Sequence, residues 1–321
     1  MGKGLPDKSD EVERLFRALL LIRRAEERIA QDYPSDRIKS PIHLSIGQEA
    51  IAVGVCDVLD RDDIVAMSYR GHATYLAKGG SLRRMVAEMY GKVAGCARGK
   101  GGSMHLVAPD MGVLGASAVV GTQVPIAAGW ALAIKRRGGG QVVACFFGEG
   151  ATEEGSMSET LNFASLHRLP MLFVCENNGY AIHEPLDKRW ATSRLCERVA
   201  TYGIPAQRIE DQDLFAIRNA AANAVARARE GQGPSFMECV TYRWREHVGP
   251  SEDYEAGYRS RAELEPWRRA DQLARLAGML PADAVERLER DVALEIDDAF
   301  AFAQSSPPPE PEELLRHVYA R

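Results

Sequence analysis

The clearest pattern in the chain is an alternation of short, continuous apolar runs with longer amphipathic stretches. Residues 142–147 and 171–175 are apolar runs, and residues 153–167 between them carry apolar positions at helical spacing. Two apolar strands joined by a helix form a βαβ unit, whose strands are parallel and buried on both faces. A helix over residues 213–230 and a strand over 235–242 continue the alternation. The pattern predicts an α/β fold with a parallel sheet flanked by helices.

Helical patterns also flank this central region. A long helix is expected over residues 10–33, because its apolar residues fall near one face and Pro34 ends it. Other expected elements are helices over residues 48–59, 82–90 and 124–136 and a short strand over 64–67. The last part of the chain is helical and charged. We therefore expect one α/β domain over residues 1–262 and a helical C-terminal extension over residues 263–321.

Composition and charge narrow the classes of function. The chain has 321 residues, of which 45% are hydrophobic and 26% charged, as in ordinary globular proteins. A formal net charge of −5 gives no support for binding nucleic acid. No apolar run reaches ~18 residues, so no membrane-spanning helix is expected. The six cysteines form no CxxC pair, which argues against structural zinc or a disulfide framework and predicts a cytoplasmic location.

Polar residues follow both apolar strands of the βαβ unit. Gly148-Glu149-Gly150 comes after the first strand, and Asn178 comes shortly after the second. Because parallel strands present their carboxyl ends at one edge of a sheet, Glu149 and Asn178 are expected to meet there. Carboxylate, amide and carbonyl oxygens suit Mg²⁺, which also accepts phosphate oxygens as ligands. Either segment alone is typical of a turn, but their combination at βαβ spacing predicts a site for a metal and a diphosphate.

Two other phosphate-binding patterns do not fit the chain. A dinucleotide fingerprint that begins at Gly148 would need a third glycine where Glu153 stands. A P-loop that ends at Lys100 would begin at Ala94 instead of a glycine, and Gly101 would replace the metal-binding Ser or Thr.

The two polar segments are part of a wider set of motifs. Gly148-Glu149-Gly150 with the later Asn177-Asn178 resembles the thiamine diphosphate motif, whose usual form is Gly-Asp-Gly followed by Asn-Asn. With further segments in the same order, the chain resembles the alpha subunit of the thiamine diphosphate-dependent first, decarboxylating component of 2-oxo acid and acetoin dehydrogenase complexes. The resemblance extends from about residue 10 to 265. The further segments are residues 43–50 (HLSIGQEA), 69–72 (YRGH), 99–105 (GKGGSMH), 121–125 (GTQVP) and 242–247 (YRWREH).

The resemblance implies a thiamine diphosphate-binding fold and a set of metal ligands. Glu149, the side chain of Asn178 and the carbonyl of Tyr180 would bind Mg²⁺. Glu149 stands where aspartate is commoner in the family. The substitution keeps a carboxylate and adds one methylene, so we expect metal binding to survive.

The resemblance also implies residues that contact the cofactor and the substrate. Arg70 and His247 would contact the phosphates, and Tyr69 would pack near the aminopyrimidine ring. The catalytic histidines would be His43, in substrate handling or proton transfer, and His72, as a pocket residue; a buried structural role is the alternative for His43. The full set of implied cofactor-binding residues is Tyr69, Arg70, Val120, Gly148, Gly150, Ala151 and His247.

The implied activity is that of an oxidoreductase. It would form a carbanion or enamine on thiamine diphosphate and pass the acyl group to a lipoyl acceptor, with a pyruvate, branched-chain 2-oxo acid or acetoin substrate. Family members with two kinds of subunit take a cofactor-activating glutamate from the beta chain. We therefore expect activity only with a beta subunit, in an α2β2 heterotetramer, and a lipoyl acyltransferase as a further partner. A carboligase or transketolase-like synthase with the same cofactor, and a cofactor-free structural subunit, stay open as alternatives.

Overall fold

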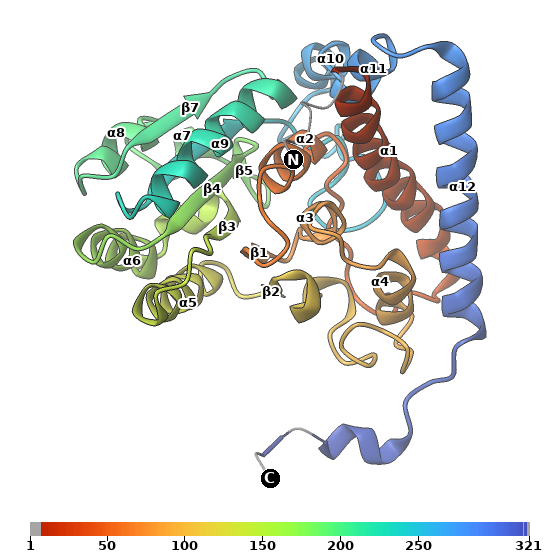
Figure 1. Cartoon of the computed structure of the whole chain (residues 1–321). Coiled ribbons are helices and arrows are strands. Elements are labelled where there is room, and N and C mark those ends of the chain that lie inside the picture. Colours follow the sequence, from red (N-terminus) through yellow and green to blue (C-terminus); the bar gives the residue numbers. More distant parts are fainter. Residues whose placement is uncertain (1–7, 317, 320–321) are drawn as a thin grey trace, which may run out of the picture.

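The centre of the computed structural model, which describes residues 8–316 and 318–319, is a six-stranded sheet. Its strands pair in the order β2-β1-β3-β4-β8-β7, and every ladder is parallel. The α/β fold with a parallel sheet flanked by helices is therefore confirmed (Figure 1). The strands are β1 (Ile64–Ser68), β2 (Val113–Ser117), β3 (Val143–Gly148), β4 (Met171–Asn177), β7 (Ala206–Ile209) and β8 (Ser235–Val240), with a separate antiparallel pair of β5 (Tyr180–Ala181) and β6 (Glu184–Pro185).

The central strands are the ones that the apolar runs predicted. Every residue of β4 is buried, and β3 is buried as far as Phe147. The sequence pattern did not predict the two edge strands. Strand β2 contains Gly115 and is mostly half-buried, while β7 exposes Gln207 and Arg208 to solvent. Edge strands lack a sheet neighbour on one side, so they need no continuous apolar run.

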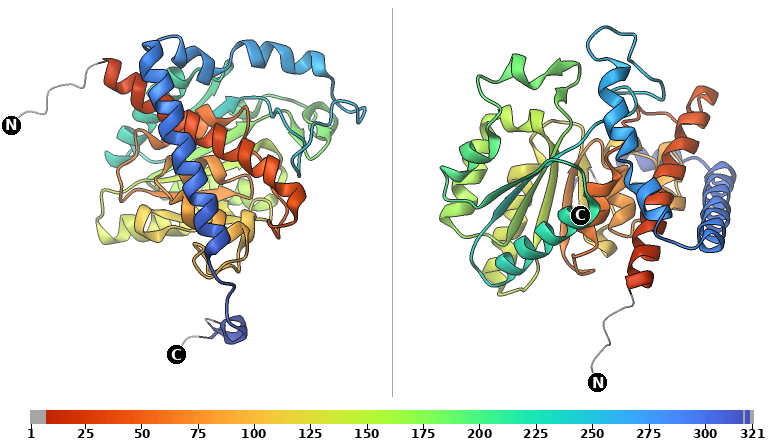
Figure 2. Two further views of the ribbon diagram at one scale, coloured as in Figure 1. Left: turned by 90° about the vertical axis from the view of Figure 1, so that its right-hand side faces the viewer. Right: turned by 90° about the horizontal axis from the view of Figure 1, so that it is seen from above.

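Helices cover both faces of the sheet, as the view from above shows (Figure 2). Successive residues of β3 serve opposite faces: Ala144 and Phe146 join one apolar cluster, and Val143, Cys145 and Phe147 join the other. The first cluster includes residues of α1, α2, α4, α9 and α12, and the second includes residues of α5, α6 and α8. These helices are α1 (Lys8–Asp32), α2 (Glu49–Cys56), α4 (Leu82–Met89), α5 (Gln123–Arg137), α6 (Gly155–Leu166), α8 (Leu195–Ala200), α9 (Leu214–Arg229) and α12 (Ala282–Ser305).

Four further α-helices complete the set of α-helices in the described residues. The sequence pattern missed α3, α7 and α8, each of which has six residues or fewer. Helices this short show too little periodicity to be recognised. No helix in the described part of the chain is both long and apolar enough to cross a membrane. These four further α-helices are α3 (His72–Ala77), α7 (Leu186–Arg189), α10 (Arg261–Arg269) and α11 (Gln272–Ala277).

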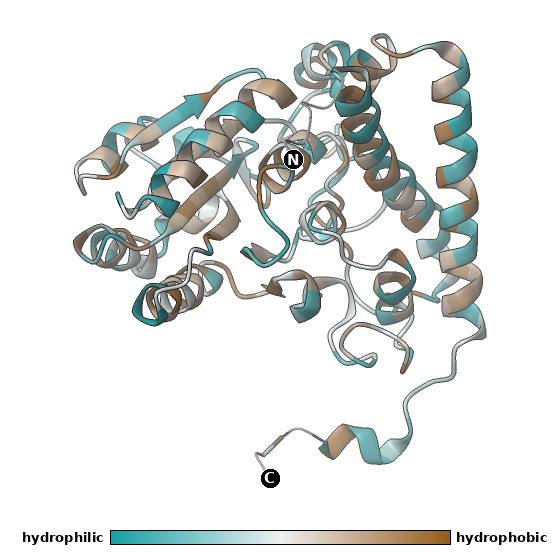
Figure 3. Ribbon diagram, in the orientation of Figure 1, coloured by the Kyte–Doolittle hydropathy of each residue, from teal (hydrophilic) through white to brown (hydrophobic). Residues whose placement is uncertain are grey.

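The C-terminal helix α12 packs along the outer side of α1 and α4 (Figures 1 and 2). Its hydrophobic and hydrophilic residues alternate along its length (Figure 3). Leu288, Val292 and Ile296 are buried in the same apolar cluster as α1, at the four-residue spacing of one helix face. The ion pair between Arg24 and Glu289 lies at 2.7 Å on the exposed border of this contact. Exposed pairs contribute little free energy, so apolar burial holds α12 in place.

We predict that Leu288→Ala destabilises the protein by about 2–5 kcal/mol, because it removes a 3% exposed side chain from the α1–α12 contact. The matched control is Leu294→Ala in the same helix, where the leucine is 68% exposed. This control should change the free energy of unfolding by no more than about 0.5 kcal/mol. Urea denaturation followed by circular dichroism measures both variants. Equal effects of the two substitutions would contradict the packing of α12.

Candidate functional site

A cavity of about 270 Å³ lies at the carboxyl ends of β1, β3 and β4. The ladder between β3 and β4 pairs Gly148 with Glu176, so the segments that follow the two strands begin at the same level of the sheet. This pairing brings Glu149 and Asn178 into one cavity, where ligands of parallel sheets bind. The lining contains every residue predicted to bind cofactor or metal: Tyr69, Arg70, Val120, Gly148, Glu149, Gly150, Ala151, Asn178, Tyr180 and His247.

The three predicted metal ligands present oxygen atoms of the kind that Mg²⁺ prefers. Glu149 begins a 3₁₀ turn (Glu149–Glu153) and is 1% exposed. Asn178 is held by two hydrogen bonds: its Nδ2 donates to Gln48 Oε1 at 2.9 Å, and its Oδ1 accepts from the Tyr180 N–H at 3.2 Å. Pro185, opposite Tyr180 in the β5–β6 ladder, has no N–H to donate to the Tyr180 carbonyl.

This donor set fits a hard divalent cation that keeps some of its coordination sphere for other oxygens. No group of three or more His, Cys, Asp or Glu side chains in the described residues could hold a metal by itself. Mg²⁺ does not require such a group, because it is commonly bound by one or two carboxylates together with water and phosphate oxygens. The remaining ligands would therefore come from the bound diphosphate and from water.

Arg70 and His247 form the cationic and hydrogen-bonding part of the lining. Arg70 is 7% exposed, and its two Nη atoms donate to Leu44 O at 2.7 Å and His247 O at 3.1 Å. Burial lowers the Arg70 pKa to about 10, so its guanidinium stays charged at neutral pH. Burial, with the nearby Arg70 charge, lowers the His247 pKa to about 3, so its imidazole is neutral. A guanidinium beside a neutral imidazole offers N–H donors to a phosphate.

His43 lies behind the cavity wall and contacts two of its lining rings. Its ring centroid is 4.4 Å from that of Tyr69 and 5.2 Å from that of His247. The His43 side chain is buried, and its Nδ1 atom has no hydrogen-bond partner. Burial and then the Arg70 charge lower the His43 pKa to about 3, so the ring is neutral and can accept a proton. An unpaired buried nitrogen of this kind needs an explanation, and it belongs to a ring that contacts the cavity-lining rings of Tyr69 and His247.

His72, the second expected catalytic histidine, does not line the cavity. It is fully buried, with its Nδ1 atom 3.1 Å from Glu26 Oε1 and its Nε2 atom 2.8 Å from Ser103 Oγ. The Glu26 carboxylate also accepts the backbone N–H of Ser45 at 2.8 Å. Both ring nitrogens of His72 are therefore engaged. These contacts tie α1 to the segment around Ser103 and do not support the pocket position expected for His72, whose catalytic role stays a prediction.

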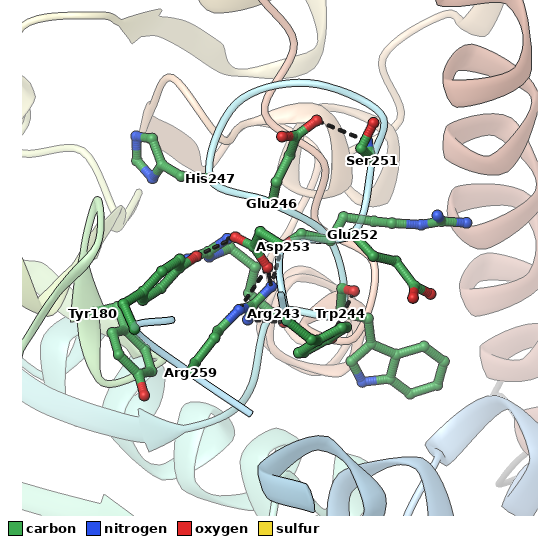
Figure 4. Close-up of polar contacts among 12 residues, drawn as sticks. Tyr180, Arg243, Trp244, Glu246, His247, Ser251, Glu252, Asp253 and Arg259 are labelled. Atoms are coloured by element: carbon green, nitrogen blue, oxygen red, sulfur yellow. Dashed lines mark hydrogen bonds and ion pairs between the residues drawn. The ribbon is translucent and has the colours of Figure 1, made fainter. Parts of the chain in front are cut away.

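The loop that carries His247 is anchored by a buried cluster of charges that sequence reasoning missed (Figure 4). Asp253 accepts hydrogen bonds from Arg259 Nε at 2.7 Å and from Arg243 Nη1 at 3.3 Å. Burial by itself would raise the Asp253 pKa, but hydrogen bonds from Tyr258 and Arg259 bring it below its usual value. The His247 ring points away from this cluster (Figure 4). The cluster therefore sets the loop backbone and leaves the imidazole free to face the cavity.

The cavity also contains residues that were not predicted. Gln48 and Gln123 line it, and both lie in segments that the family resemblance had matched, so a signal for them existed. Glu176 also lines it, and burial raises the Glu176 pKa to about 7. Arg189 of α7 forms an ion pair with Glu149, with 2.7 Å between Nη2 and Oε1. No sequence pattern indicated Arg189, because its partner is 40 residues away in the chain.

The lowered pKa values of His43 and His247 predict that the folded protein loses stability in acid. Between pH 3 and the ordinary histidine pKa of 6.5, the unfolded chain binds protons at His43 and His247 that the folded chain does not bind. The free energy of unfolding should therefore fall as the pH drops below 6.5, by up to ~1.4 kcal/mol per pH unit for each histidine. His43→Asn should reduce this slope, because it removes one of the two histidines whose pKa is lowered by burial. Denaturation curves between pH 7.5 and 5 measure the slopes. A slope unaltered by His43→Asn would contradict a buried neutral His43.

Comparison with known proteins places this chain in a family. Residues 17–312 match the family described as the dehydrogenase E1 component. The acetoin:2,6-dichlorophenolindophenol oxidoreductase alpha subunit of Cupriavidus necator is 37% identical, with 98% of this chain and 96% of that protein covered. The pyruvate dehydrogenase E1 component alpha subunit of Zymomonas mobilis is 38% identical, over 99% of this chain and 90% of that protein.

A mitochondrial relative matches nearly as well. The somatic mitochondrial pyruvate dehydrogenase E1 component alpha subunit of Homo sapiens is 35% identical, over 95% of this chain and 78% of that protein. Acetoin-type and pyruvate-type relatives are about equally similar to the chain, so sequence identity does not distinguish between the two types. Both the matched length and the identities lead to one conclusion: this chain belongs to the dehydrogenase E1 component family.

Proposed function

We propose that the chain is the alpha subunit of a thiamine diphosphate-dependent dehydrogenase that acts on a 2-oxo acid or on acetoin. The observation that carries the proposal is the convergence of Glu149, Asn178 and Tyr180 with Arg70 and His247 in one cavity. The first three residues offer oxygen ligands for Mg²⁺, and the other two offer donors for phosphate. Membership of the E1 family supports the use of thiamine diphosphate.

The glycines of the 148–150 turn give the diphosphate room beside the metal. A Cβ atom on Gly150 would lie 2.9 Å from the Cβ of Ala181, so a larger residue would push the β5–β6 hairpin away. The main chain of Gly150 and Ala151 can thus line the diphosphate closely. Bound thiamine diphosphate supplies an electron sink for cleavage of the bond next to the substrate carbonyl.

The substrate would approach the cavity beside Tyr69 and His43. Tyr69 lines the cavity and contacts the His43 ring, so it can orient both the cofactor ring and the imidazole. The unpartnered Nδ1 of His43 is the atom that we assign to proton transfer at the substrate oxygen. A neutral imidazole is the form that can accept this proton, which agrees with the lowered His43 pKa.

The exposed apolar surface next to the cavity supports a second chain in the active enzyme. Val119 and Val120 at the cavity edge are 63% and 42% exposed, and Ile126 and Trp130 on the outer face of α5 are 53% and 42% exposed. Apolar surface that borders a ligand site is typical of a protein interface. We propose that a beta subunit covers this surface in an α2β2 heterotetramer and supplies the cofactor-activating glutamate, and that a lipoyl acyltransferase receives the acyl group.

The metal assignment is tested at Glu149. Glu149→Ala should weaken Mg²⁺-dependent thiamine diphosphate binding by more than ~100-fold, because loss of an outer-sphere partner alone costs 10–100-fold. Glu149→Asp is the matched control: it keeps the carboxylate and should bind within a factor of about ten of the wild type. Isothermal titration calorimetry of the chain with its beta subunit measures both affinities. Normal binding by Glu149→Ala would refute the assignment.

The acceptor is tested with a lipoyl domain. The chain and its beta subunit together should acylate and reduce the lipoyl group with pyruvate, a branched-chain 2-oxo acid or acetoin, and the chain alone should not. Mass spectrometry of the lipoyl domain detects the transferred acyl group. Transfer to an aldehyde or sugar with no lipoyl acylation by any of these substrates would instead favour a carboligase or transketolase-like synthase.

A further inference from the structure

Arg189 is the charged group closest to the predicted metal ligand Glu149. Its Nη2 atom lies 2.7 Å from Glu149 Oε1, its Nη1 atom forms an ion pair with Glu153, and its Nε donates to the Glu184 carbonyl at 3.1 Å. The side chains of Arg189 and Glu149 are 10% and 1% exposed. The guanidinium therefore occupies a specific, largely buried position against Glu149 and Glu153, which both line the cavity.

The fold of the segment after β4 holds Arg189 in this position. The β5–β6 hairpin turns the chain back, and the Leu186 N–H closes it with a 3.0 Å hydrogen bond to the Gly179 carbonyl. Helix α7 follows directly and carries Arg189 at its last residue. The Arg189 Nη1 atom lies 3.8 Å from the position of a Cβ on Gly150. The guanidinium thus lies close both to the predicted metal ligand and to the glycine turn proposed for the diphosphate.

A buried carboxylate needs a positive charge or donors nearby. Burial raises the Glu149 pKa, while the charge of Arg189 and backbone hydrogen bonds from Glu149 and Asn178 oppose that rise. The free protein therefore satisfies Glu149 without a metal. A divalent cation on the same carboxylate would face the guanidinium as a like charge, and both would compete for Oε1.

We propose that Arg189 is a resident counter-ion of Glu149, which Mg²⁺ displaces when it binds. This inference rests on the proposed function. Displacement requires the loss of one contact, because Glu153 and the Glu184 carbonyl keep partners for the guanidinium after Glu149 is released. Arg189 holds the Glu149 carboxylate in position in the free protein, and it lowers the affinity for the metal.

The test compares Arg189→Gln with Lys188→Gln, which removes the same charge one residue away on an exposed side chain. The chain with its beta subunit is titrated with MgCl₂ by calorimetry, with and without saturating thiamine diphosphate. Arg189→Gln should bind Mg²⁺ roughly 10- to 100-fold more tightly than the wild type, the scale of outer-sphere effects on metal affinity. Lys188→Gln should match the wild type.

A second measurement needs no change at Arg189. Trp190 is the next residue, and its ring stacks 3.8 Å from the Arg198 guanidinium. Mg²⁺ with thiamine diphosphate should change the tryptophan fluorescence of the wild type, and Trp190→Phe should remove that change. An equal change of fluorescence in the wild type and in Trp190→Phe would argue against release of Arg189.

The outcomes separate this inference from the proposed function. Equal or weaker Mg²⁺ binding by Arg189→Gln, with normal binding by the wild type, overturns the counter-ion role and leaves the function standing. Weaker binding would identify Arg189 as a group that orients Glu149 in the metal complex. If Arg189→Gln binds Mg²⁺ and the wild type does not, the result would give the strongest support for displacement of Arg189 by the metal. Absence of metal binding in every variant would overturn the proposed function and the inference together.

Discussion

The parallel pairing of β3 with β4 is the interaction on which the site depends. It pairs Gly148 with Glu176, and the residues just beyond that pair, Glu149 and Asn178, carry the predicted ligands. A slip of one residue would turn the side chains of a strand to the opposite face and would separate the two ligands. Both strands are continuous apolar runs, so burial on both faces of the sheet holds the register.

Around this edge the protein buries several charged groups and pairs them with groups of opposite charge. Asp253 is held between Arg243 and Arg259, and Glu149 is held by Arg189. A buried charge without a partner is costly, so removing one member of such a pair affects more than the pair itself. At Glu149 this need for a charged partner bears on the proposed function. The Arg189 charge that balances the Glu149 carboxylate would also compete with a metal ion for it.

Much of the fold could be predicted because burial leaves a local record in the sequence. Strands β3, β4 and β8 are apolar runs, and α1 and α9 show helical spacing, so each was expected from its own residues. Strands β2 and β7 were missed because half-buried edge strands show neither a continuous apolar run nor clear alternation. The cavity-lining set was predicted through motif order, and His72 shows the limit of that approach: its neighbour Arg70 lines the cavity, whereas His72 itself is engaged by Glu26 and Ser103.

The sequence by itself determined the α/β class, the family resemblance and the residues expected to bind metal and diphosphate. These depend on local hydrophobic pattern and on motifs within short segments. Only the tertiary structure decided which charges meet: Arg189 of α7 pairs with Glu149, which lies 40 residues away in the chain. It also decided that His43 keeps an unpartnered nitrogen beside the cavity. The physical reason is that ion pairs and cavities are made by side chains from separate elements, and their distances are set by how those elements pack.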